Sequence, residues 1–287
     1  MNFSVITPSW NQGKFIGECL SSVAGQDCGT YEHIVLDNCS DDNTAEVVAG
    51  FPGVRFLREK DRGQSHALNK GFAMARGEII CWLNSDDAYK PGTFRVLLDY
   101  FADPSTMVVF GDVEQVSYDG RPPQRAVAVF EDRLDLVRWW TSRARLHQPA
   151  VFFRRSAREA AGDLREDLHF AMDYEYWWRL SGLFAFRRCG DVLAVQYRQP
   201  ESKTILDWDR VLAEREIIFS PHYGLIGGAA VVAREKRRAV AAHHIRCAYA
   251  AGSRAAALAS IGKAIRTRPA TIFSMAALGA LRRAARL

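Results

Sequence analysis

The stretch that decides the fold is Glu78–Asp87, which reads EIICWLNSDD. An apolar run that ends in polar residues is typical of a buried strand whose carboxyl end opens into a site. The adjacent acids Asp86 and Asp87 repel each other and resist desolvation, so we expect a cation, a sugar hydroxyl or solvent to take up their charge. The competing interpretation is a solvated turn in which an Asp caps a helix.

The composition is that of a globular chain. Its 287 residues are 48% hydrophobic and 25% charged, which suffices for one large domain or for a domain with an appendage. The six cysteines show neither CxxC spacing nor a paired framework, which favours reduced thiols in a cytoplasmic protein over disulfides or a zinc site. No basic segment with an apolar core opens the chain, so we expect no signal peptide. No run of about 18 uncharged apolar residues predicts a membrane span.

Charge is distributed unevenly along the chain. The net charge is +5, yet residues 229–287 contain 12 Lys and Arg and a single acid, Glu235. Such a segment suits an anionic membrane surface, while a solvated helical face is the simpler alternative. Because no nucleic-acid-binding module is recognisable, we expect no nucleic-acid partner.

Strands and helices alternate in the first part of the chain. The predicted strands are Phe3–Thr7, His33–Leu36 and Val54–Leu57, and the predicted helices are Lys14–Ala24 and Ala45–Gly50. This order predicts a parallel, doubly wound sheet that binds ligands at the carboxyl ends of its strands.

Three of these strand ends carry polar clusters, at Thr7–Gln12, Asp37–Asp42 and Ser85–Asp87, and we expect them to converge. Between the second and third, Ser65 is predicted to cap a helix that Gly77 terminates. Neither GxGxxG nor GxxxxGK[ST] follows any predicted strand, which argues against a dinucleotide dehydrogenase and a P-loop kinase.

The rest of the chain divides at residue 205. Before it, the pattern predicts helices at Pro91–Phe101 and Met172–Leu180 and strands at Met107–Gly111, His147–Phe153 and Val192–Tyr197. After it only helices are predicted, at Ile205–Phe219, Ala229–Ala250, Ser253–Arg266 and Ala270–Arg286. We therefore predict a domain at 1–204, with a nucleotide-binding half (1–112) and an acceptor half (113–204), and a basic helical extension at 205–287.

Four motifs in order resemble the family 2 glycosyltransferases of GT-A fold. They are Val5–Asn11, Asp37 with Ser40–Thr44, Gly77–Ile79 leading to Ser85–Asp87, and Asp173 in an aromatic helix. The resemblance covers about residues 2–205 and implies a mixed, mainly parallel sheet flanked by helices. It also implies transfer of a sugar, with inversion, from a UDP or dTDP donor to an acceptor hydroxyl in polysaccharide or glycolipid biosynthesis. Since the family's processive Gln-x-x-Arg-Trp element is absent, we expect a single-sugar transfer, in the cytoplasm or on the inner membrane face.

The resemblance also implies roles at the strand ends. The nucleoside pocket would be lined by Pro8, Ser9 and Asn11, and Asp37 would accept the N3 hydrogen of a uracil or thymine ring. The alternative for Asp37 is a cap of the following loop. By the same resemblance, Asp86 would face the ribose or sugar hydroxyls and Asp87 would bind Mg²⁺ or Mn²⁺ at the diphosphate.

The general base implied by the resemblance is Asp173. Many family members carry Glu-Asp here, whereas this chain has Met172 before the Asp, so only the second acid is kept. Glu175 is the alternative base. Trp177 and Trp178 would stack on a sugar ring or, as such aromatic residues more often do, belong to the core.

The remaining candidates are less specific. Donor or acceptor contacts are expected among Arg62, Gln64, His66, Lys70, His147 and Arg198. Many relatives have Tyr-Arg-x-His after the last strand, but residues 197–200 read YRQP here, so Arg198 or Lys203 would supply charge to the diphosphate instead. Two alternatives stay open, a nucleotidyltransferase-like protein and a protein that binds a nucleotide sugar without transfer.

Overall fold

The computed structural model describes residues 2–27, 29–117, 121–141, 143–198, 207–250 and 253–285. These form two compact units, described separately below. One comprises Met1–Leu136 with Arg143–Ile218, and the other Val137–Ser142 with Phe219–Leu287. The predicted boundary at 204/205 lies outside the described residues, as do Gln199, Pro200 and Lys203.

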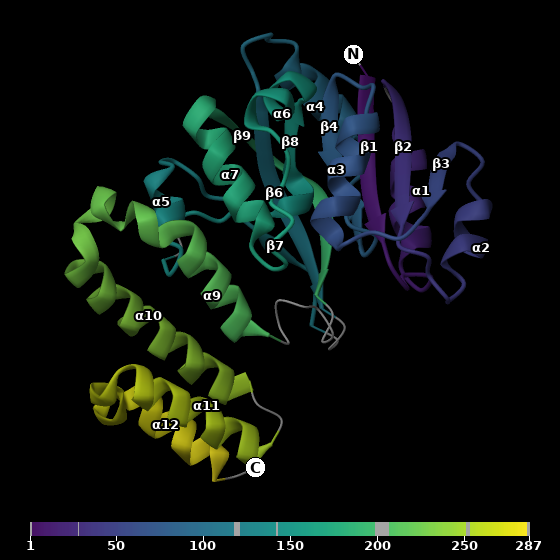
Figure 1. Cartoon of the computed structure of the whole chain (residues 1–287). Coiled ribbons are helices and arrows are strands. Elements are labelled where there is room, and N and C mark those ends of the chain that lie inside the picture. Colours follow the sequence, from purple (N-terminus) through teal and green to yellow (C-terminus); the bar gives the residue numbers. More distant parts are fainter. Residues whose placement is uncertain are drawn as a thin grey trace. The chain divides into compact units, whose positions relative to one another are not determined.

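A mixed sheet forms the centre of the first unit (Figure 1). Its strands are β1 (Asn2–Ser9), β2 (Thr30–Asp37), β3 (Val54–Arg58), β4 (Ile79–Trp82), β5 (Asp87–Tyr89), β6 (Val108–Ser117), β7 (Gln124–Ala126), β8 (Val151–Arg154) and β9 (Phe186–Arg198). The strand order is β3-β2-β1-β4-β8-β6-β9-β5, and β7 pairs with β6. The β3-β2-β1-β4 half is parallel, which confirms the predicted α/β architecture, and antiparallel β8 joins it to β6.

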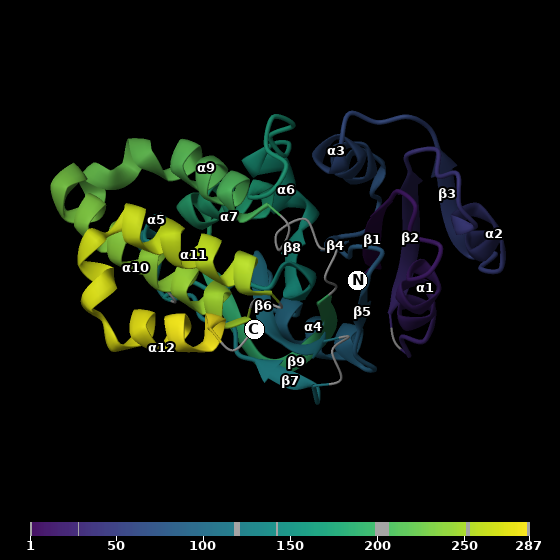
Figure 2. The same cartoon turned by 90° about the horizontal axis from the view of Figure 1, so that it is seen from below.

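Helices cover both faces of this sheet. They are α1 (Ile16–Ala24), α2 (Thr44–Ala49), α3 (Gln64–Met74), α4 (Thr93–Phe101), α5 (Leu134–Val137), η1 (Gln148–Ala150), α6 (Arg155–Ala161), α7 (Met172–Leu183) and α9 (Trp208–Phe219). In Figure 2, α3, α6 and α7 lie on one side of the sheet and α1 and α4 on the other. Both faces of the central strands are therefore buried, which explains their near-continuous apolar sequences.

Alternate side chains of β4 pack on opposite faces of the sheet. Ile79 and Cys81 join the core cluster that contains Phe94 of α4. Trp82 faces the other way, and its ring centroid lies 6.3 Å from that of Trp177 on α7. Strand β4, which precedes the two acids, thus packs directly against the helix that carries Asp173.

Several predicted details differ in the structure. The predicted cap at Ser65 is wrong, because α3 begins at Gln64 with Gly63, at a φ of 125°, in the N-cap position. Asp87 does not lie in a solvated turn, as the competing interpretation of the sequence held. It begins β5, which pairs antiparallel with β9. The free thiols expected from the spacing are observed at the described cysteines.

The second unit is helical. It contains η2 (Ser220–Ile226), α10 (Gly228–Ala250), α11 (Arg254–Thr267), η3 (Pro269–Phe273) and α12 (Met275–Ala284). Small and branched side chains such as Ala248, Ile261 and Ala277 fill its core, so the helices approach closely. The predicted C-terminal helices are confirmed. Within the described residues no helix is long and apolar enough to cross a membrane.

Candidate active site

The carboxyl ends of β1 and β2 meet, as the sequence predicts. The Asn38 amide donates to the Ser9 carbonyl at 2.9 Å, and the Asn11 amide donates to Ser40 Oγ at 2.8 Å. In return the Asp41 amide donates to Asn11 Oδ1 at 3.0 Å. Asn11 adopts a φ of 53°, a conformation that Asn tolerates better than most residues. The two loops are thereby joined into one polar wall.

Asp37 lies at the base of this wall and is 1% exposed. Its carboxylate accepts from the Ser40 amide at 2.9 Å and from Ser40 Oγ at 2.5 Å, and Arg58 Nε lies 3.7 Å away. Asp37 therefore holds the loop after β2, as the capping alternative expected. A carboxylate has about four acceptor positions, so this does not exhaust its capacity to bind a nucleobase.

Asn84 connects three elements at the end of β4. Its Oδ1 accepts from Gln64 Nε2 of α3 at 2.8 Å and from Trp82 Nε1 at 2.9 Å. Its Nδ2 donates to Gln148 Oε1 at 2.9 Å, while Gln148 Nε2 donates to the Trp82 carbonyl at 2.6 Å. These bonds fix the peptide that leads into the two acids.

The two acids differ in burial. Asp87 is 4% exposed, whereas Asp86 is half-buried. Burial, and then the charge of Asp86, raises the pKa of Asp87 well above its usual range, against hydrogen bonds from the Tyr197 backbone and the Asn84 side chain. Such a pair fits a divalent cation, since Mg²⁺ is usually held by one or two carboxylates together with substrate phosphates. Among the described residues no group of three or more His, Cys, Asp or Glu gathers as a metal site.

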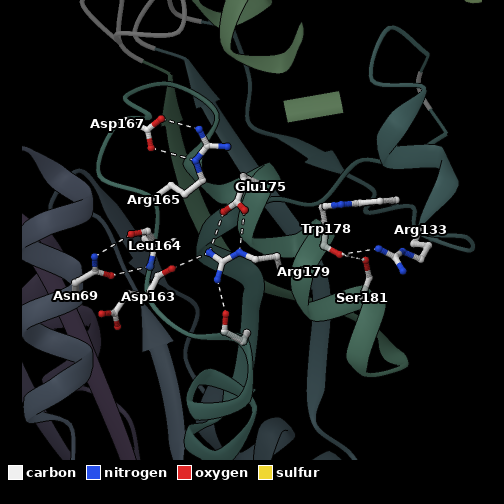
Figure 3. A network of polar contacts seen from close by, with 11 residues as sticks. Asn69, Arg133, Asp163, Leu164, Arg165, Asp167, Glu175, Trp178, Arg179 and Ser181 are labelled. Atoms are coloured by element: carbon white, nitrogen blue, oxygen red, sulfur yellow. Dashed lines mark hydrogen bonds and ion pairs between the residues drawn. The ribbon is translucent and has the colours of Figure 1, made fainter. Parts of the chain in front are cut away.

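The start of α3 contacts the loop that precedes α7. Arg62 pairs with Glu166, at 2.6 Å from Nη2 to Oε2, and Ser65 Oγ donates to the Leu168 carbonyl at 3.4 Å. Asn69 exchanges two hydrogen bonds with the backbone of Leu164, at 2.8 and 2.9 Å (Figure 3). The segments before and after residue 112 are thus joined within one unit.

His66 and Lys70 have local partners. His66 Nδ1 accepts from the Arg62 amide at 3.2 Å, and Lys70 Nζ forms a 2.7 Å ion pair with Glu59. The structure places both residues on α3, which also supplies Gln64 to Asn84.

Asp173 occupies the first turn of α7 and is half-buried. Burial raises the pKa of its carboxyl, while a 2.8 Å hydrogen bond from the Tyr174 amide and the charge of Arg215 oppose that rise. A carboxyl with a raised pKa is a better proton acceptor than an ordinary Asp, provided that it is ionised.

The other α7 candidates have structural partners. Glu175 is 6% exposed and forms a bidentate ion pair with Arg179, at 2.8 and 2.9 Å. Arg179 also donates to the Asp163 carbonyl (Figure 3). Trp177 is fully buried, and Trp178 is 8% exposed with the Arg133 guanidinium 3.9 Å above its ring. Both tryptophans lie in packed surroundings, as the core interpretation expected.

His147 immediately precedes Gln148 and so lies beside the end of β4. Burial first, and then Arg145, lowers the pKa of His147 to about 4, with Arg198 acting in the same direction. This imidazole is neutral at pH 7, and its buried Nε2 has no hydrogen-bond partner among the described residues. Arg198 itself ends β9 and is exposed.

With this geometry established, similarity to known proteins decides the family. Residues 4–160, more than half of the chain, match the family model described as glycosyl transferase family 2. The chain belongs to glycosyl transferase family 2. In this family 2 chain the strand-end wall and the acidic pair lie within the matched segment, and Asp173 follows it.

Curated relatives agree with this assignment. The chain is 32% identical over 194 residues to an uncharacterised protein of Mycobacterium tuberculosis (strain CDC 1551 / Oshkosh), covering 62% of this chain and 61% of that protein. It is 29% identical over 182 residues to a PGL/p-HBAD biosynthesis glycosyltransferase of Mycobacterium bovis (strain BCG / Pasteur 1173P2), covering 61% and 67%. The chain thus spans 61% and 67% of the length of these two relatives.

Solved structures confirm the GT-A fold. The mannosyltransferase PcManGT from Pyrobaculum calidifontis, in complex with GDP-Man and Mn²⁺, is 20% identical with a TM-score of 0.59 and covers 99% of this chain and 79% of that one. S. aureus TarS 1–349 in complex with UDP is 20% identical with a TM-score of 0.55 and covers 93% and 89%.

The sequence interpretation of this family 2 chain missed the two amides Asn84 and Gln148. The available signal was an amide beside each of two apolar strands, Asn84 after β4 and Gln148 before β8, because a buried amide in such a place needs a partner. It also missed Glu214, whose contacts are described below. No local pattern marks a residue that acts on a loop more than 40 residues away.

Proposed function

We propose that this chain transfers a single sugar, with inversion, from a nucleoside diphosphate sugar of UDP or dTDP type to an acceptor hydroxyl in polysaccharide or glycolipid biosynthesis. The observation that carries the proposal is the set of hydrogen bonds that Asn84 forms with Gln64 of α3 and Gln148 of η1. These bonds fix the end of the strand that precedes the acidic pair. One relative is described as a PGL/p-HBAD biosynthesis glycosyltransferase and another as a putative teichuronic acid biosynthesis glycosyltransferase, and TarS was solved in complex with UDP and with UDP-GlcNAc. Residues 1–112 would hold the donor and 113–204 the acceptor, with 205–287 as a basic extension.

The nucleoside would lie against the β1–β2 wall. Ser9 Oγ is buried and lacks a hydrogen-bond partner among the described residues, so a ribose or base atom that bonds to it would remove an unsatisfied group. Trp10, next to it, is 60% exposed and offers a face on which a base can stack. Pro8, Asn11 and Asp37 complete this pocket in the proposal.

The diphosphate end would lie at Asp86 and Asp87. Asp87 would hold Mg²⁺ or Mn²⁺, which supplies Lewis-acid neutralisation of the departing diphosphate when it is bound, and Asp86 would face the ribose or sugar hydroxyls. The mixed burial of the pair supports this assignment, because a carboxylate at 4% exposure beside another carboxylate is costly unless a ligand compensates its charge. Arg198 at the end of β9 would add positive charge.

Asp173 would act on the acceptor as the general base. In the proposed step, the acceptor hydroxyl gives its proton to the Asp173 carboxylate as its oxygen bonds to the anomeric carbon. The bond from that carbon to the diphosphate breaks, and its electron pair leaves with the diphosphate. The packing of Trp82 on Trp177 supports the proposal, since it holds the helix that carries Asp173 beside β4, the strand that precedes the acidic pair.

A donor screen tests this function. Release of nucleoside diphosphate is measured with UDP-glucose, UDP-GlcNAc, dTDP-glucose and GDP-mannose, with and without Mn²⁺. We expect a uridine or thymidine donor to be used, Asp87→Ala to weaken its binding, and Asp173→Asn to keep donor binding while losing turnover. Asp99→Asn, at an exposed position of α4, is the matched control. Donor binding without turnover in the wild type would favour a binding protein instead, and full turnover by Asp173→Asn would place the base elsewhere.

The basic extension would contact an anionic membrane on the cytoplasmic side. Phe273 and Met275, at the turn between α11 and α12, are 87% and 81% exposed, and residues 253–285 contain six Lys and Arg and no acid. Exposed apolar side chains with surrounding cations suit an interface rich in anionic lipid. Sedimentation with phosphatidylglycerol vesicles should fall for a Phe273→Ser/Met275→Ser variant, with phosphatidylcholine vesicles as the control. Equal sedimentation of variant and wild type would refute this contact.

A further inference from the structure

A carboxylate from α9 binds the backbone directly in front of α7. Glu214 is 9% exposed, and its two oxygens accept from the amides of His169 at 2.7 Å, Phe170 at 2.7 Å and Ala171 at 2.9 Å. Ala171 is the N-cap residue of α7, and Asp173 follows two residues later. Glu214 itself lies outside the segment, 4–160, that matches the family model.

These bonds fix the segment that leads into α7. The three amides precede Met172, the first residue of the helix, and the N-cap residue, Ala171, forms no side-chain cap. Their acceptor lies 43 to 45 positions away in the sequence, and hydrogen bonds to a carboxylate are among the stronger ones. The path of residues 169–171 therefore depends on α9.

The next residue of α9 acts on the same turn. The Arg215 guanidinium lies 4.4 Å from the centroid of the Tyr174 ring, in the range of a cation–π contact. Glu214 and Arg215 thus hold the residues on both sides of Asp173, one through the backbone and one through a side chain.

We infer that Glu214 and Arg215 are positioning residues, which fix the location and the charge environment of Asp173 during sugar transfer. This inference rests on the proposed role of Asp173 as general base. It makes α9 a part of the acceptor site, although the helix stands beyond the parts of the chain that carry the family's motifs.

The charges support the same conclusion. Arg215 lowers the pKa of the Asp173 carboxyl and Glu214 raises it, while burial is the largest influence. Arg215 lowers the pKa of the adjacent Tyr174, and so does Arg145, which lies on the segment before η1. Because the two α9 residues act in opposite directions, neutralising one or the other should move the titration of Asp173 in opposite directions.

The kinetic test uses full-length Glu214→Gln and Arg215→Gln with the best donor of the screen. Glu216→Gln, on the same helix, is the matched control. A base that is displaced by about 1 Å can cost on the order of 10²-fold in rate. We therefore expect Glu214→Gln to lower kcat by roughly 10- to 100-fold with little change in donor KM. The acidic limb of the pH–rate profile should move to lower pH in Glu214→Gln and to higher pH in Arg215→Gln.

Two measurements do not need turnover. Hydrogen exchange at residues 169–171 should become faster in Glu214→Gln than in Glu216→Gln. The Asp173 carboxyl, followed by ¹³C NMR in the full-length protein, should titrate at lower pH in Glu214→Gln and at higher pH in Arg215→Gln.

The outcomes separate this inference from the proposed function. If Asp173→Asn retains full turnover, the proposed base is wrong, whatever the α9 variants do. If Asp173→Asn is inactive but Glu214→Gln keeps the wild-type kcat, pH profile and exchange rates, the positioning role is refuted. A lower melting temperature with unchanged kcat and pH profile would also overturn it, since that is the result of a merely structural contact.

Discussion

Replacing Asn84 with alanine should destabilise the first unit through the loss of one shared partner. The change removes the acceptor of two donors, Gln64 Nε2 and Trp82 Nε1, and the donor that satisfies Gln148 Oε1. It also removes the hydrogen bond from the Asn84 side chain to Asp87. No alanine atom replaces any of these bonds. Water can reach the half-buried Gln64, but Trp82 is 2% and Gln148 8% exposed.

The expected cost follows from the two buried groups. A buried polar group left without a partner costs about 1–3 kcal/mol, so two of them cost about 2–6 kcal/mol of unfolding free energy. That is a large part of the roughly 5–15 kcal/mol by which domains are stable. Because water can hydrate Gln64, the loss of its hydrogen bond adds little to this cost in unfolding free energy.

The assay must report on the first unit alone, because the chain has two compact units and a single unfolding transition is not assured. We suggest urea unfolding followed by hydrogen exchange in peptides from β1 and β4. Asn43→Ala, at an exposed position, is the control and should cost less than about 0.5 kcal/mol. A double-mutant cycle of Asn84→Ala and Gln148→Ala should show an interaction free energy of at least about 0.5 kcal/mol. A loss below about 1 kcal/mol for Asn84→Ala, or additive effects in the cycle, would refute the reasoning.

Three further results are expected. Arg179→Met, which leaves the buried Glu175 charge without its partner, should cost about 3–5 kcal/mol in urea unfolding, and a loss under 1 kcal/mol would contradict this. Gly71→Ala places a Cβ 2.4 Å from Ile6 Cγ2, so it should lower stability by about 1–3 kcal/mol, with Gly53→Ala as the control. Because burial raises the pKa of Asp173 and a base acts when deprotonated, the wild-type rate should rise with pH through a value above that of an ordinary Asp; a limb at or below the ordinary value would argue against this base.

The sequence predicted those parts of the fold that depend on short-range patterns. The strand at Val54 and the helix after Asn43 lie within a residue or two of the predicted positions, since apolar periodicity and turn residues act over a few positions. The convergence of the Asn11 and Asp37 loops was also predicted, because parallel strands place their carboxyl ends at one edge.

The parts that were missed depend on distant partners. Short β5 exists because Asp87 pairs with Gln196, more than 100 residues later in the chain. Helix α6, with the sequence RSAREAA, has a single buried residue, Ala157, and so no apolar stripe by which to recognise it. In both cases tertiary contacts, rather than local propensity, decide the structure.

The buried carboxylates of the first unit illustrate how structure adds to sequence. Glu214 is compensated by three backbone amides, and Glu175 by the two prongs of Arg179, so each has a partner that the fold supplies. Asp87 differs, because burial and the charge of another carboxylate, Asp86, raise its pKa, and its hydrogen bonds do not outweigh them. A protein tolerates such an arrangement when the site serves a ligand rather than the fold. The adjacent acids that end EIICWLNSDD therefore favour the proposed ligand site over helix capping, since Asp87 begins a strand.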